Sequence, residues 1–203
     1  MTPGRSLPAL VAALAVAAGC APQRVHVPAS GLPREAIPST FAPLRWSVRP
    51  DDIPALFPNR ELRQDSWSDA VRHVTWTVSD VRRIDGVAGA LVADWIEGGD
   101  LWRVRLAFAD PRRDCDPDLV ERPRRCAEAG ALAGVYDALQ AELARGRGAP
   151  EATRAASGAR TAAWRGTDVR LSLWMKLDAR GAWSVEAVVT SALAAPGRDA
   201  APR

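Results

Sequence analysis

Alternation of apolar and polar residues is the feature that most limits how this chain can fold. Between residues 101 and 109, the apolar side chains Trp102, Val104, Leu106 and Phe108 occupy every second position. The same period recurs over 74–78, 169–177 and 183–189, and residues 90–95 are apolar on both faces. Successive side chains of a strand point to opposite faces, so this period predicts half-buried strands around a central one. Turn residues at 98–100 and 178–181 predict hairpins.

Two segments have the features of helices. Residues 50–57 begin with Pro50, Asp51 and Asp52, which suit a helix N-terminus. Residues 127–145 place Leu132, Val135, Tyr136, Leu139 and Leu143 on one face. The element order predicts an α+β fold with an antiparallel sheet of five or six strands and a short and a long helix on one face. It also fits two diverged halves, each a helix followed by a meander.

The N-terminus has the pattern of an export signal. Arg5 is the only charge before a twelve-residue apolar run, 7–18, and a membrane-spanning helix needs about 20 residues. The following Val16-Ala17-Ala18-Gly19-Cys20 resembles the bacterial lipobox. The resemblance implies that Cys20 receives a diacylglycerol, that the chain is cut before it, and that the new amine carries an acyl chain such as palmitate. A plain secretory peptide with an incidental cysteine is the alternative.

By the same resemblance, Ala21 in place of Asp implies an outer-membrane destination. We therefore expect a lipoprotein of the cell envelope, facing the periplasm and anchored to the membrane through acyl chains on Cys20. Residues 1–19 form the predicted signal peptide and residues 20–43 a proline-rich tether, with packing of that segment along the domain as the alternative. Residues 44–193 form the predicted globular domain and 194–203 a disordered tail.

The two remaining cysteines, Cys115 and Cys126, predict a disulfide. An exported protein folds in an oxidising space, and with Cys20 assigned to lipid the remaining number is even. A loop of 12 residues closed in this way would stabilise the fold by about 3 kcal/mol in the chain-entropy model. A metal site is not expected here, because neither histidine is near in sequence.

Motifs that would identify an enzyme are absent from the sequence. There is no metalloprotease, nucleophile-elbow, phosphate-loop or dinucleotide motif, so we expect no cofactor. A catalytic set built on His73 with a serine and an aspartate stays open, since triads assemble across a fold. A net charge of +3 is too small to predict a nucleic-acid partner.

One tryptophan stands apart from the predicted core. Trp174 shares a strand face with Arg170, Ser172 and Lys176, opposite Leu171, Leu173 and Met175. An indole among cationic and polar side chains suits a glycan, a peptide or an anionic polymer. The alternative is that Trp174 packs under the long helix or on its cationic neighbours.

The segment Leu44–Ile53 resembles the opening of small periplasmic lipoproteins with the architecture of the SmpA/OmlA group and of beta-lactamase-inhibitor proteins. The resemblance implies a binding module without a catalytic centre. We therefore expect a non-catalytic binding, scaffold or assembly factor with an envelope protein or glycan as partner. A glycan-binding module or an envelope hydrolase is the alternative.

Overall fold

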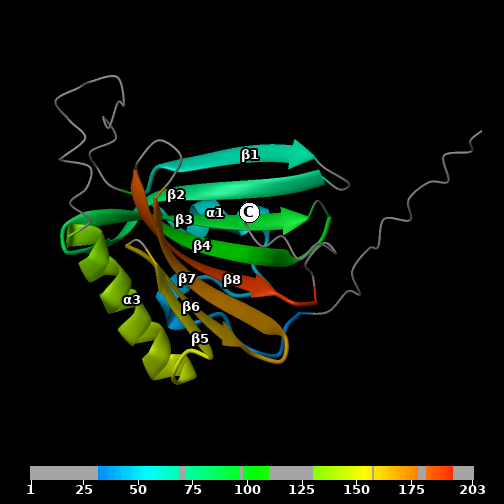
Figure 1. Ribbon diagram of the computed structural model, residues 1–203. Coiled ribbons are helices and arrows are strands. Elements are labelled where there is room, and N and C mark those ends of the chain that lie inside the picture. The colour runs from blue at the N-terminus through cyan, green and yellow to red at the C-terminus, as the bar shows by residue number, and fades with distance from the viewer. Residues whose placement is uncertain are drawn as a thin grey trace, which may run out of the picture.

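An eight-stranded antiparallel sheet forms the centre of the molecule in the computed structural model (Figure 1). The structure describes residues 32–68, 72–96, 98–109, 130–156, 158–177 and 182–193. Cys20, Cys115, Cys126, the predicted signal peptide and the predicted tail lie outside these residues. Within the described part of the chain, no helix is both long and apolar enough to cross a membrane.

The sheet consists of two four-stranded meanders. The strands are β1 (Leu62–Ser68), β2 (Arg72–Ile84), β3 (Val87–Ile96), β4 (Leu101–Ala109), β5 (Ala152–Ala156), β6 (Ala159–Arg165), β7 (Val169–Leu177) and β8 (Trp183–Ser191). Their order across the sheet is β1-β2-β3-β4-β8-β7-β6-β5. The two meanders therefore meet where β4 pairs with β8, and β1 and β5 form the two edges.

The strand count corrects the predicted fold, which was wrong in expecting an α+β fold with five or six strands. The protein is mostly sheet, with eight strands and only one long helix in the described residues. The prediction missed β1, β5 and β6. Every residue of β1 after Leu62 is exposed, and β5 and β6 are rich in alanine. Neither pattern shows the apolar alternation that identifies a strand.

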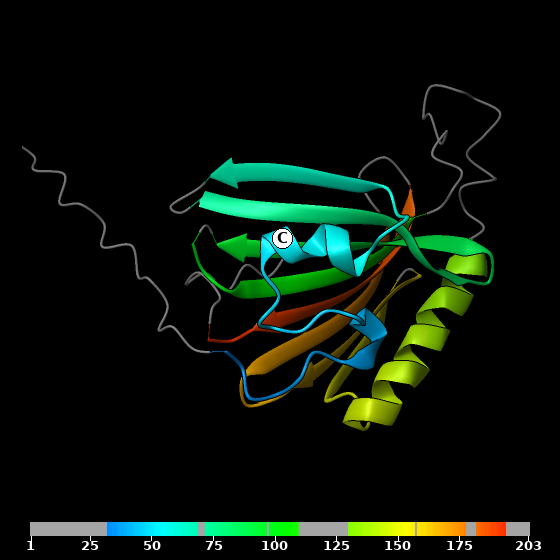
Figure 2. The same ribbon diagram turned by 180° about the vertical axis from the view of Figure 1, so that it is seen from behind.

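The helices lie where the sequence predicted them. The short segment is the 3₁₀ turn η2 (Pro50–Asp52) followed by α1 (Ile53–Leu56), and the long helix is α3 (Gly130–Arg147). Helix α1 lies behind the strands in Figure 1 and in front of them in Figure 2. Both helices contribute to the same core, because Ile53 and Leu139 are fully buried in one apolar cluster with side chains of the sheet.

Half of the predicted tether belongs to the folded domain. Residues 32–57 form a segment, here called the N-terminal strap, that crosses one face of the sheet and contains η1 (Ser39–Phe41) (Figure 2). Ile37 and Phe41 of this segment are buried in the core. For residues 32–43 the tether prediction was therefore wrong, because these side chains gain more from burial than the prolines gain from staying extended in water. Residues 20–31 lie outside the described part of the chain.

Candidate ligand-binding face

The strand register divides the sheet into two unlike faces. The covered face meets α1, α3 and the strap, and carries the buried alternate residues of each strand, such as Leu173 of β7 and Val185 of β8. The opposite face, here called the open face, carries the residues between them. Neither α1 nor α3 packs on it. Figure 1 is drawn from the side of the open face.

The four predicted ligand residues lie on the open face as alternate residues of β7. Trp174 is half-buried and sits opposite Thr161 of β6 and Glu186 of β8. The ammonium of Lys176 lies 5.9 Å from the Trp174 ring centroid and 3.4 Å from a carboxylate oxygen of Glu186. Arg170 is exposed and Ser172 half-buried. Trp174 therefore does not lie under α3, and ligand binding by these residues stays a prediction.

Arginines gather at one end of the open face. Arg103 of β4 pairs in register with Thr190 of β8, which pairs with Arg170 of β7, which in turn pairs with Arg165 of β6. Arg105 lies in the next row, opposite Val188. This end of the open face therefore brings four arginines together, and Nε of Arg165 lies 3.9 Å from a carboxylate oxygen of Glu151.

A buried carboxylate, which the sequence analysis did not identify, lies beside these arginines. Asp94 of β3 is fully buried, and its Oδ1 accepts a hydrogen bond of 2.7 Å from the Thr75 hydroxyl. Its Oδ2 accepts a 2.7 Å hydrogen bond from Nε of Arg103 and lies 3.7 Å from Nε of Arg105. A signal for this site was present, since a carboxylate within an apolar central strand must be paired when it is buried.

His73 of β2 lies on the open face near this carboxylate but is packed between aromatic rings. The centroid of its imidazole ring lies 3.8 Å from that of Trp67, on which it stacks, and 6.0 Å from that of Trp102. His73 is fully buried. The nearby hydroxyl of Thr75 donates directly to Asp94. A triad instead places its histidine between the hydroxyl and the carboxylate. The described residues around His73 therefore do not reproduce the triad that the sequence left open.

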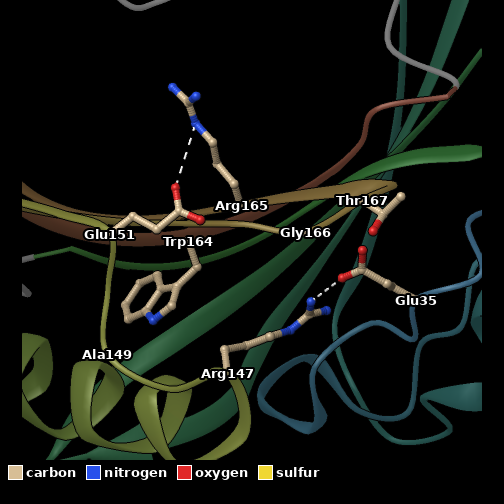
Figure 3. Close-up of a pocket in the computed structure, with 8 residues that line it drawn as sticks. All are labelled: Glu35, Arg147, Ala149, Glu151, Trp164, Arg165, Gly166 and Thr167. Carbon is tan, nitrogen blue, oxygen red and sulfur yellow. Dashed lines mark hydrogen bonds and ion pairs between the residues drawn. The ribbon is translucent and has the colours of Figure 1, made fainter.

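A cavity of about 530 Å³ lies between the strap, the end of α3 and the β6–β7 turn, lined among others by Glu35, Arg147, Trp164 and Thr167 (Figure 3). The Glu35 carboxylate accepts hydrogen bonds from the Asp168 backbone N–H and from Arg147. These bonds, the first from Asp168, lower the pKa of Glu35. Glu35 of the strap and Arg147 of α3 bind each other across the cavity. This contact fastens the strap to the domain.

No metal centre is formed by the residues described, which contain no group of three histidine, cysteine, aspartate or glutamate side chains placed to hold an ion. Comparison with known proteins found no matching family model, curated protein or solved structure. The candidate site is therefore defined by its own geometry: a sheet face on which neither α1 nor α3 packs, with the half-buried indole of Trp174 on β7 and a group of arginines at one end.

Proposed function

We propose that the protein is a lipid-anchored lipoprotein of the cell envelope that binds a partner on its open face without catalysing a reaction. The observation that supports this function most directly is the placement of Trp174, half-buried beside Lys176 on a face where neither helix packs. A half-buried indole on a sheet face offers a large rigid surface for a ring or a chain, and the cations beside it orient a polar partner.

Site-specific crosslinking in the native cell tests this function. A photo-crosslinking residue is placed at Ser172 on the open face, and as a control at the exposed Ala138 on α3. We expect a defined adduct from position 172 and none from position 138, because only the open face contacts the partner. Equal adducts at both positions, or none at position 172, would contradict the proposal.

The lipid anchor has its own test. We expect the intact mass of the membrane fraction to equal the chain from Cys20 onward plus a diacylglycerol and one further acyl group. Cys20→Ala should abolish the modification and release the protein from the membrane, because no other thiol stands at the lipobox. Recovery of a soluble, unmodified chain that begins near residue 20 would refute lipidation.

We further propose that Cys115 and Cys126 form a disulfide. Thiol counting on unfolded, unreduced protein should then find no free thiol in the lipidated chain. Two free thiols would show that these cysteines are reduced.

A further inference from the structure

We propose that β1 is an edge at which two copies of this chain pair antiparallel, so that their sheets join into one. Within the described part of the chain, β1 is paired on one side only, with β2, and every residue of it after Leu62 is exposed. Such an edge presents a row of backbone groups that are available to another strand. The inference goes beyond the proposed function, because it concerns an edge of the sheet and a second copy of the chain.

The pairing with β2 determines which backbone groups of β1 point outward. The Ser79 backbone N–H donates a 3.0 Å hydrogen bond to the carbonyl of Glu61, one step beyond the pair of Leu62 with Val78. Hydrogen-bonded and non-hydrogen-bonded pairs alternate along an antiparallel ladder. The backbone groups of residues 62, 64, 66 and 68 therefore point away from β2. A second strand can form hydrogen bonds only in a register that joins these even-numbered positions.

The charges of β1 favour one of these registers. Placing Gln64 opposite Gln64 of the second copy sets Arg63 opposite Asp65 in both directions. A shift of the register by one pair either way puts Arg63 or Asp65 opposite itself, which is destabilising. Both side chains are exposed, and Nε of Arg63 lies 3.0 Å from an Asp65 oxygen of its own chain. Two copies would therefore bring together four charges of alternating sign.

The two edges of the sheet differ in this respect. Charged residues on an edge strand usually prevent contact with other sheets, but Arg63 and Asp65 complement a second copy of themselves. The other edge, β5, carries Arg154 and no acidic residue, so two copies of β5 offer no such pairing. Self-association is therefore assigned to β1.

Pairing centred on Gln64 has a two-fold axis perpendicular to the sheet. Opposite residues of antiparallel strands point to the same face, so the open face of one copy continues into that of the other. About six backbone hydrogen bonds would join the two strands. Because this contact is short and its side chains stay largely in water, we expect a weak, reversible dimer. Such a dimer presents two copies of Trp174 on the same side, which strengthens binding to a repetitive partner.

Sedimentation velocity of the mature chain in detergent, from about 1 µM to 1 mM, tests the inference. We expect a dimer that increases with concentration. Arg63→Asp and Asp65→Arg should each raise the dimer Kd about tenfold, because each places like charges opposite each other twice. An equimolar mixture of the two variants should dimerise at least as well as the unaltered chain, since acids then oppose arginines. Arg45→Asp, at an exposed strap residue, makes the same charge change and should leave the Kd unchanged.

Gln64→Pro tests the backbone pairing itself. Its missing N–H is one that points away from β2, so circular dichroism should show an unchanged fold, while the dimer loses its two central hydrogen bonds. A dimer that survives this variant overturns the assignment to β1. The inference is also overturned by a chain that stays monomeric at the highest concentration, by unchanged dimers of the single charge variants, or by a mixture that does not restore association. None of these results affects the crosslink from Ser172, so failure of the inference and failure of the proposed function are distinguishable.

Discussion

Asp94 is the residue on which the arrangement of the open face depends. It is fully buried, accepts hydrogen bonds from Thr75 and Arg103, and lies 3.7 Å from Nε of Arg105, so its charge is stabilised by these protein partners in place of water. Asp94→Asn keeps the shape but leaves two arginines without their counter-charge. We expect the free energy of unfolding to fall by about 3 kcal/mol, measured by urea denaturation.

The matched control is Asp65→Asn on the exposed edge strand, where the aspartate pairs with Arg63 in water. Exposed ion pairs contribute little, so this variant should change stability by at most about 0.5 kcal/mol. If the two variants lost similar amounts of unfolding free energy, burial of Asp94 would not account for its contribution to stability.

Glu35 makes the stability of the fold depend on pH. Its pKa in the folded state is lowered from 4.5, first by the Asp168 backbone N–H and then by Arg147. Its contribution is therefore fully present above the unfolded-state pKa and is lost as the pH falls through the lower folded-state value. We expect Glu35→Gln to lower the Tm at pH 7. Plotted against pH, the Tm values of the variant and of the unaltered protein should converge below pH 4.5. Glu61→Gln, at an exposed site, is the control.

At the scale of elements, packing of β3 against β4 requires glycine at position 89. A Cβ added there would lie 2.6 Å from Cε1 of Phe108, whose ring is fully buried. Gly89→Ala should destabilise the protein by about 1–3 kcal/mol, because a packed core cannot shift to admit the methyl group. In α3, a Cβ at Gly146 would meet no atom within 4 Å. Gly146→Ala should instead be neutral or stabilising by up to about 1 kcal/mol, by the same denaturation experiment.

The elements that the sequence predicted are those whose side chains alternate between environments. Helix α3 was evident from Leu132 to Leu143, and β7 and β8 from their period of two, because a buried face imposes apolar residues at fixed intervals. Strand β1 has no such face, since it is an edge with one neighbour. Strands β5 and β6 are held by backbone pairing and by Ala162 and Trp164, and alanine carries little strand signal.

The candidate site was predictable only in part. The period of β7 was enough to place Trp174, Arg170, Ser172 and Lys176 on one face. The arginine group was not predictable, because it depends on β4 pairing with β8, two strands about 80 residues apart in the chain. Pairing between distant segments is set by packing of the whole core, which no local pattern encodes.

At the scale of the whole molecule, the two meanders share one core. The apolar cluster includes Trp95 and Leu106 from the first half, Leu173 and Val185 from the second, and Phe41 from the strap. Neither half has a separate core, so we expect a single unfolding transition. Tryptophan fluorescence and far-ultraviolet circular dichroism should give the same midpoint in guanidinium chloride. Two separate transitions would show that the meanders unfold independently.

The N-terminal strap also determines how the domain would respond to mechanical force. A pull on the chain ahead of residue 32 would first act on the hydrogen bond from the Arg34 backbone N–H to Asp168, next on the Glu35–Arg147 contact at the end of α3, and then on the buried Ile37 and Phe41. These groups would have to slide out of the core together, a shear that is resisted by many contacts at once. The sheet edges β1 and β5, which could be peeled one hydrogen bond at a time, lie further along the chain and are shielded from that load.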